Sequence, residues 1–208
     1  MSDRAQSSEA LQKQREHDLN IFILHKSPDL AAGFHCNDHV NKMRTEGCQM
    51  LSTAIHTLLS AHSMLRTTFA GVCLQDCTKP AFPAHPCTRW VMESVHNYCW
   101  LWRLCQALTR EHEFRFSNND LQSKRRLNGS LHHPPMLFPD QSKDRNRTLD
   151  IRTIKPGFGT TPAQAIATDC KHDDPVTAYR RYYIRHKSHL HRWTPMSPPA
   201  WLTDPQYT

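Results

Sequence analysis

One long predicted helix carries polar side chains where an ordinary amphipathic helix would not need them. In the segment FHCNDHVNKMRTEGCQMLSTAIHTLL, residues 34–59, polar residues recur every three or four positions. They are His35, His39, Lys42, Glu46, Gln49 and Thr53. At 3.6 residues per turn their side chains fall within about 80° of one another. An apolar stripe that begins at Val40 runs beside them, so we expect this polar stripe to line a cleft at the edge of the core.

The polar stripe has the residue types needed for acid–base chemistry or for holding a base. Histidine titrates near neutral pH, Glu46 can accept a proton, and Gln49 can read hydrogen-bonding edges. Lys42 lies one turn from Glu46, which would keep its amine protonated, so we predict a phosphate or carboxylate binder rather than a nucleophile. Two alternatives remain: His35 and His39 could ligate a metal ion, or the stripe is a solvated face with ion pairs.

A second constellation begins in HPCTRWVMESVHNYCW, residues 85–100. Pro86 marks the start of a helix that we expect to continue to about Glu113. Backbone N–H groups at a helix start favour an anion, so His85 and Thr88 are predicted to lie near a bound phosphate. The alternative is that His85 only caps the helix.

The same predicted helix carries its own polar stripe. Arg89 is expected to hold phosphate, and Asn97 and Trp100 to read and stack on a base. Glu93 lies between them and is a second candidate for catalysis. If the two long helices pack side by side, both polar stripes face one cleft; alternatively, Trp100 packs in the core.

A third helix is predicted near the C-terminus, with Asp174 as its cap and Pro175 at its first position. Its segment AYRRYYIRHKSHLHRW alternates basic and aromatic residues, and no acidic residue occurs from Pro175 to Thr203. This composition suits a nucleic-acid backbone and unstacked bases. The predicted contacts are Arg180, Arg181, Tyr183, Arg185 and Lys187. The alternative is a helix that docks by its tyrosines while its arginines are solvated.

Cysteine spacing offers a weak zinc signal. Cys73, Cys77 and Cys87 lie near His85 in the sequence, but a single CxxxC pair lacks the CxxC repeats of a zinc ribbon. The histidines at 186, 189 and 191 could add ligands. We therefore predict no metal ion and no cofactor, and keep zinc as the alternative. The eight cysteines are expected to be reduced thiols.

The chain as a whole is predicted to be mainly α: a compact single helical domain with one short buried strand and a long irregular insert. We expect a flexible extension over residues 1–19, the domain over 20–202, the strand at 20–24, the first long helix over about 37–67, the insert over 117–160, and a tail over 203–208.

Composition limits the class of protein. Mean hydropathy is −0.68, and no apolar run reaches the ~18–20 residues that a membrane span needs. We expect no membrane contact and a cytoplasmic location. The 26 basic against 19 acidic residues give a net charge of +7, which suits DNA as partner. Nothing in the sequence indicates the oligomeric state.

Three separated segments resemble a widespread, largely uncharacterised family of small phage-encoded proteins. They are NIFIL…AAGFHCNDHVNKM, HPCTRWVMES..NYCWL and TPAQA…HDDPVTAYRRYYIRHKSHLHRW…PAWL, within residues 20–202. More distantly, the order of parts is similar to the pyrimidine-dimer DNA glycosylase group. That resemblance implies a compact, mainly helical fold that grips DNA. It also implies a catalytic carboxylate, for which Glu46 is the first candidate and Glu93 the second.

The resemblance leads to a specific expectation: a phage enzyme acting on a flipped pyrimidine nucleotide of DNA, in the host cytoplasm. Members of the glycosylase group use the amine at the chain start as nucleophile. Because 19 residues precede NIFIL here, we expect hydrolytic base excision or base modification instead. Glu46 would be the general base or charge stabiliser, and His35 and His39 would transfer or orient protons. The alternative is a non-catalytic nucleic-acid-binding or host-takeover protein, in one version stabilised by zinc.

Overall fold

The structure, a computed structural model, describes residues 19–61, 77–116, 154–155 and 157–207. Within these residues five helices pack together and there is no strand, which confirms the prediction of a mainly α fold. The helices are α2 (Pro28–Phe34), α3 (Asn37–Ala61), α5 (Pro86–Glu93), α6 (Val95–Phe116) and α8 (Pro175–Lys187). Short 3-10 turns follow at η3 (Thr168–Cys170), η4 (Ser188–Leu190) and η5 (Ala200–Thr203).

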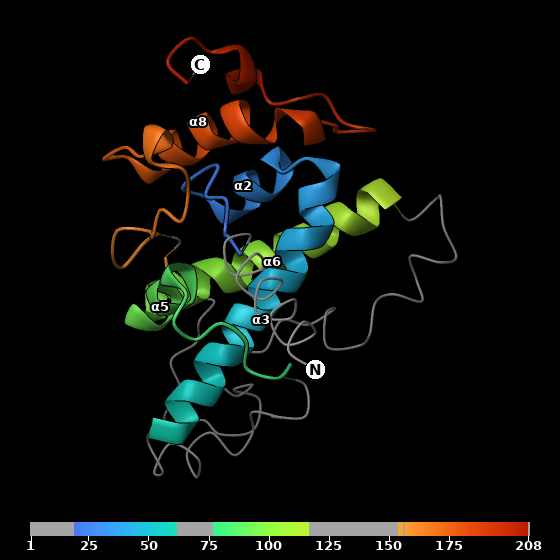
Figure 1. Cartoon of the computed structure of the whole chain (residues 1–208). Helices are drawn as coiled ribbons and strands as arrows, with labels where there is room; N and C mark the ends of the chain where they lie inside the picture. Colours follow the sequence, from blue (N-terminus) through green and yellow to red (C-terminus); the bar gives the residue numbers. More distant parts are fainter. Residues whose placement is uncertain (1–18, 62–76, 117–153, 156, 208) are drawn as a thin grey trace, which may run out of the picture.

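The core forms where α3 and α6 cross. Both α2 and α3 pack on α6, and α5 packs against α3 and α6. Figure 1 shows α3 running along the molecule, with α8 across the end beyond α2. Gly47 lies at the crossing, where an added Cβ would collide with the Cys105 sulfur. A glycine is therefore needed there for the close approach of the two helices.

Residues 20–24, predicted to be a buried strand, are buried but not a strand. Phe22 has a φ of 48°, which breaks an extended conformation, and Leu24 N–H closes a tight turn on Phe22 O at 2.9 Å. The Asn20 side-chain oxygen accepts from Ile21 N–H at 2.8 Å. The strand prediction is wrong because this apolar run is a compact turn with no partner strand among the described residues.

The second long helix, predicted to run unbroken from Pro86, is interrupted at Ser94, which is extended with φ −153° and ψ 142°. The Asn97 side chain spans the break and donates to Trp90 O at 2.8 Å. Its oxygen accepts from Gly159 N–H at 2.8 Å, and an added Cβ at Gly159 would meet the Ser94 side chain. The break therefore makes room for the segment around Gly159.

The cap predicted for the third helix is confirmed. The Asp174 carboxylate accepts from Thr177 N–H at 3.0 Å, and Pro175 opens α8. Within the predicted tail, Tyr207 is buried, and its hydroxyl accepts from Arg180 Nη1 at 2.7 Å. Arg180 therefore ties the last residues to α8.

Several predictions fall on residues that the structure does not describe. These are residues 1–18 of the extension, the last part of the first predicted long helix (residues 62–67), Cys73 and most of the insert. The described end of the insert, residues 154–155 and 157–160, has neither helix nor strand. None of the described helices is long and apolar enough to cross a membrane.

Candidate functional site

The first turn of the polar stripe is closed to solvent. His35 and His39 are 0% and 2% exposed. His35 Nδ1 hydrogen-bonds Ala31 O at 2.6 Å. The His39 ring stacks on Phe22 with centroids 4.4 Å apart, and its Nδ1 lies 2.7 Å from the Tyr183 hydroxyl. We call this group of side chains the Tyr183 junction; it lies in the core and does not form a cleft wall, contrary to expectation.

The Tyr183 junction holds both histidines neutral. Burial lowers the pKa of His35 to about 4. Burial, followed by the charges of His35 and Lys42, lowers the pKa of His39 to about 2. The Tyr183 oxygen also accepts from Cys36 N–H at 2.9 Å, so the hydroxyl joins the start of α3 to the His39 ring. Neither ring is placed to exchange protons with a substrate.

The later turns of the polar stripe support two loops. The Lys42 amine lies 3.5 Å from Glu46, whose side chain is 14% exposed. Glu46 Oε2 accepts from Asn20 N–H at 3.2 Å, and the Asn20 amide donates to Ala165 O at 2.9 Å. Farther along α3, the Thr53 hydroxyl accepts from the N–H of residue 81 at 2.9 Å. Gln49 is partly exposed between Glu46 and Thr53 on α3.

A cavity of about 720 Å³ that is partly open to solvent lies beside these two loops. Its walls are Phe82, Pro83, Ala84, His85, Pro86, Gln164, Ala165, Ile166, Ala167, Lys171 and Tyr182. A second hollow of about 430 Å³ shares Gln164 and Lys171 with it. Small-molecule sites commonly measure about 300–1,000 Å³ and combine apolar walls with a few polar groups. The cavity meets both conditions, with the rings of Phe82 and Tyr182, the Gln164 amide and the Lys171 amine.

Hydrogen bonds to the backbone hold the cavity walls. His85 Nδ1 accepts from Cys87 N–H at 3.2 Å, which fixes the start of α5. The Tyr179 hydroxyl donates to Ala163 O at 2.6 Å, and Gln164 exchanges two hydrogen bonds with the backbone of His172. Burial raises the pKa of the Cys87 thiol to about 12, so this cysteine is a neutral packing group. The walls are therefore set before any ligand binds.

The predicted site residues of the second helix do not share one cleft: some lie in the core and others at the surface. Thr88 is buried, and Arg89 is exposed on α5. Asn97 and Trp100 are buried, and the Trp100 indole donates to Lys26 O at 2.7 Å. They pack in the core and cannot stack on or read a base. Glu93 accepts from the Thr160 hydroxyl at 2.8 Å. It is the last residue of α5, about 10 Å along the helix from Pro86, which lines the cavity.

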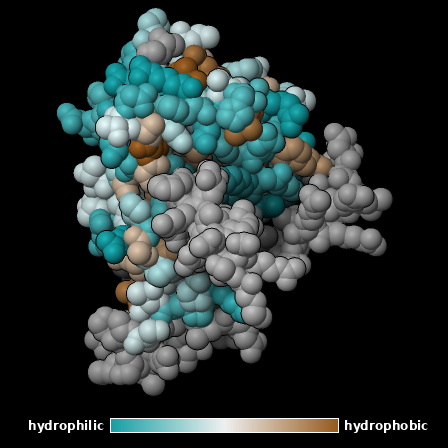
Figure 2. All heavy atoms as spheres, viewed as in Figure 1, coloured by the Kyte–Doolittle hydropathy of each residue, from teal (hydrophilic) through white to brown (hydrophobic). Residues whose placement is uncertain are grey.

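The predicted nucleic-acid contacts on α8 also do not form one surface, because some of them are buried and others are exposed. Tyr183 is buried, and Arg180 Nε donates to Leu24 O at 3.0 Å while its guanidinium lies over the Trp201 ring at 5.0 Å. Arg181 is partly buried. Arg185 is exposed, and the Lys187 amine lies over Tyr182 at 5.4 Å. The α8 end of the molecule presents mostly hydrophilic atoms in the view of Figure 2.

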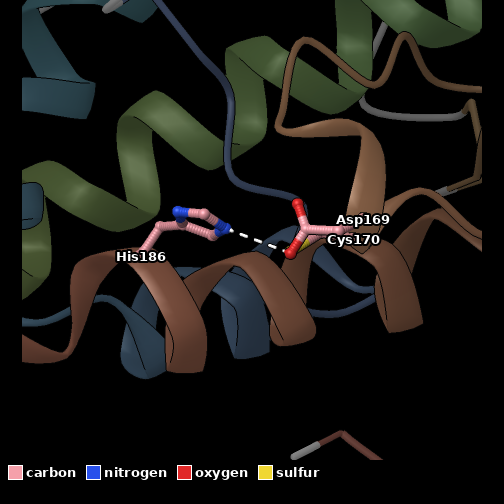
Figure 3. A group of neighbouring side chains, drawn as sticks. All are labelled: Asp169, Cys170 and His186. Atoms are coloured by element: carbon pink, nitrogen blue, oxygen red, sulfur yellow. Dashed lines mark hydrogen bonds and ion pairs between the residues drawn. The ribbon is translucent and has the colours of Figure 1, made fainter.

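One group in the described part of the chain has the composition and spacing to hold a metal ion: Asp169, Cys170 and His186. Their ligand atoms lie within 4.8 Å of one another (Figure 3). Cys77 and Cys87, named by the sequence as weak zinc candidates, belong to no such group there. The sequence pointed to His186 only as an added ligand and did not point to Asp169 or Cys170.

Of the predicted site residues, the structure brings His85 to the cavity and Lys42, Glu46 and Gln49 to the α3 face near its loops. Sequence reasoning missed the cavity residues Phe82, Gln164, Lys171 and Tyr182. The only available signal was the TPAQA segment, which lies between the insert and α8. Comparison with known proteins gave no matching family model, curated protein or solved structure.

Proposed function

We propose that the protein is a DNA-acting enzyme that works on a pyrimidine nucleotide, by base excision or base modification, and that the nucleotide enters the cavity between Phe82 and Tyr182. The observation that carries this proposal is the cavity itself: about 720 Å³, with aromatic rings, an amide and an amine on its walls. These are the groups that a nucleotide taken out of the base stack would require.

The base would lie among the rings. Phe82 and Tyr182 are the two aromatic residues of the cavity lining. Stacking on an aromatic side chain contributes about 1–3 kcal/mol per base. The Gln164 amide bonds the His172 backbone through one N–H and its oxygen, and its second N–H and second oxygen lone pair would be the groups that meet a pyrimidine edge.

The phosphates would lie toward the positive groups. Lys171 is exposed at the cavity and in the adjoining hollow. Arg185 and Lys187 lie on α8, which also supplies Tyr182. They would extend the positive charge along the DNA strand that carries the flipped base. Counterion release by such contacts supplies most sequence-independent affinity for DNA.

Glu46 remains the proposed charge stabiliser, because a general base must lie within hydrogen-bond reach of the proton it removes and Glu46 is not among the residues that line the cavity. Its carboxylate accepts from Asn20 N–H, and the Asn20 side chain donates to Ala165 O on the cavity wall. Asn20 therefore connects Glu46 to that wall. The Lys42 amine lies 3.5 Å from the Glu46 carboxylate. Glu93 is the weaker candidate because it lies at the far end of α5 from the cavity. His35 and His39 no longer have a catalytic part in this proposal.

A recognition protein without catalysis is the second candidate. The observation in its favour is that α8 carries Arg185 exposed and Lys187 partly exposed, whereas the two histidines of the polar stripe are buried and neutral.

Mass spectrometry of nucleosides separates the two candidates. DNA is incubated with wild-type protein, with Glu46→Gln, and with Glu113→Gln as a control at an exposed glutamate of α6. An enzyme releases or alters a pyrimidine with wild type and Glu113→Gln, and Glu46→Gln loses that activity while keeping its DNA affinity. Unchanged nucleosides together with salt-sensitive binding would support the recognition protein and overturn the enzyme.

A further inference from the structure

Three side chains from two elements converge at the edge of the cavity. Asp169 and Cys170 belong to η3, and His186 lies in the last turns of α8. Figure 3 shows the His186 ring turned toward the Asp169 carboxylate, with Cys170 next to Asp169. His186 Nε2 lies 3.4 Å from Asp169 Oδ2, and Cys170 Sγ lies 3.7 Å from the same oxygen.

These separations match the edges of a tetrahedral metal site. Zinc binds sulfur at about 2.3 Å and nitrogen or oxygen at about 2.0–2.2 Å, which places neighbouring ligand atoms about 3.3–3.7 Å apart. The two measured separations fall at 3.4 and 3.7 Å, and the third ligand pair lies within 4.8 Å. A thiol, an imidazole and a carboxylate together favour zinc over magnesium or calcium, which prefer oxygen ligands.

We propose that Asp169, Cys170 and His186 bind one zinc ion, with the fourth position open to water. The group is partly accessible, since Asp169 and His186 are 56% and 40% exposed while Cys170 is buried. A metal ion can therefore enter from solvent, and the sulfur is already in place beneath it. The proposal does not depend on the proposed function.

One cation competes for the same carboxylate. Arg185 Nη1 lies 3.9 Å from Asp169 Oδ2 and donates to Asp169 O at 3.2 Å. Its side chain is 37% exposed, so the guanidinium can keep the carbonyl contact and leave the carboxylate to the metal. A dication held by three ligands outweighs this long ion pair at the surface.

The bound ion would fix the wall of the cavity. Cys170 directly precedes Lys171, and the His186 ring stacks on Tyr182 with centroids 5.1 Å apart. Lys171 and Tyr182 both line the cavity. Zinc would thus join η3 to α8 beside Lys171 and Tyr182, two of the residues that line the cavity.

Metal analysis and cobalt titration test the site. The full chain is purified without added zinc, its zinc content is measured, and the metal-free protein is titrated with zinc and with Co²⁺, whose thiolate charge-transfer absorption reports a cysteine ligand. The wild type should bind one equivalent and unfold at a higher temperature with zinc present. Cys170→Ser and His186→Gln should each weaken binding by more than about 100-fold, beyond the effect of about 10–100-fold that follows when a residue that only hydrogen-bonds a metal ligand is changed.

Two matched controls locate the ion. Cys77→Ser removes a cysteine of the alternative group, and His189→Gln removes an exposed histidine of η4; both should bind zinc as the wild type does. Asp169→Asn provides a surface variant in case Cys170→Ser does not fold, and circular dichroism checks each. The proposal is overturned if the wild type binds no zinc in tenfold excess, or if Cys77→Ser loses the ion while Cys170→Ser and Asp169→Asn keep it.

Discussion

Tyr182 and Tyr183 are neighbours in the sequence but face two different regions. Tyr183 is fully buried and hydrogen-bonds Cys36 N–H and His39. Tyr182 is partly exposed and lines the cavity with Phe82 and His85. Both regions contain histidine, tyrosine and phenylalanine, yet one is a packed junction and the other is open. The difference shows that residue type alone does not identify a site, because the side chains must also border a cavity that a ligand can enter.

The packed region uses its polar groups to hold helices together. The Arg115 guanidinium, whose side chain is 0% exposed, donates to His35 O at 2.7 Å and to Gly33 O at 3.1 Å. The open region has its backbone anchored by Asn20 and Tyr179 but keeps Lys171 in solvent. Changes in the first region should therefore affect stability, and changes in the second should affect binding.

The largest expected effect is on Arg115. Replacing it with Met removes the side-chain donor to Gly33 O and to the buried His35 O, and it removes the ion pair of Glu111. We expect the free energy of unfolding to fall by about 3 kcal/mol or more, as when one partner of a buried pair is removed. Urea unfolding followed by circular dichroism measures it.

Arg110→Met is the matched control on the same helix. Arg110 pairs with Asp29 at 2.6 Å, but the two side chains are 62% and 65% exposed. A surface pair contributes at most about 1 kcal/mol. Equal losses in the two variants would contradict the assignment of Arg115 to a buried, stabilising network.

The next effect is a dependence of stability on pH from the buried histidines. The unfolded chain takes up protons on them below their ordinary pKa of 6.5, whereas folded His35 does so only near pH 4 and His39 near pH 2. The stability they contribute is complete above pH 6.5 and falls as the pH drops toward 4. Each contributes up to about 1.4 kcal/mol per pH unit.

Unfolding free energies at pH 7 and pH 5 test this account. His39→Gln keeps a hydrogen-bonding partner for the Tyr183 hydroxyl but cannot titrate, so it should show a smaller loss between the two pH values than wild type. His96→Gln, at an exposed position of α6, should keep the full loss. An unchanged loss in His39→Gln would mean that His39 is protonated in the folded protein.

Lys171→Ala should change binding and leave stability alone. The amine is exposed at the cavity, so the free energy of unfolding should stay within about 0.5 kcal/mol of wild type. Loss of a charged hydrogen bond to phosphate, about 1.5–3 kcal/mol, should weaken binding of thymidine 5′-monophosphate about tenfold or more. Binding of thymidine should not change. Calorimetric titration measures both ligands, and Lys155→Ala at another exposed lysine is the control.

The smallest effect separates two cations of α8. Lys187→Ala should weaken DNA binding only a few-fold and lower the slope of log K against log salt by about 1, with no loss of stability. Arg180→Ala should instead lower stability, because Arg180 holds Leu24 O and Tyr207. Fluorescence anisotropy at several salt concentrations and urea unfolding distinguish them. A reversed pattern would place Arg180 in the DNA contact.

Helices were largely predictable because their signals are local. Periodic apolar residues and the Asp174–Pro175 start identified α3 and α8. The break at Ser94 depends on Gly159, far along the chain, so periodicity could not reveal it. The turn at Phe22 likewise depends on the partners of Asn20 rather than on the apolar run.

The candidate site was less predictable than the fold. Spacing placed His39 and Glu46 on one helix face, but it could not show that α8 covers His39 with Tyr183 while Glu46 stays partly exposed. The cavity walls come from two loops without periodicity, and Lys171 has no motif around it. His85 was found because a Pro-started helix marks its own beginning.

The most direct test of the central claim is to fill the cavity. Ala84 is exposed on its wall, so Ala84→Trp should occupy the space without disturbing the core, and Ala200→Trp at exposed η5 is the matched control. The ligand is a fluorescent duplex with one T·T mismatch, whose base is easier to unstack. We predict at least about tenfold weaker binding for Ala84→Trp, since a stacked base contributes about 1–3 kcal/mol, and near wild-type binding for Ala200→Trp. A folded Ala84→Trp that binds this duplex like wild type would contradict nucleotide binding in the cavity.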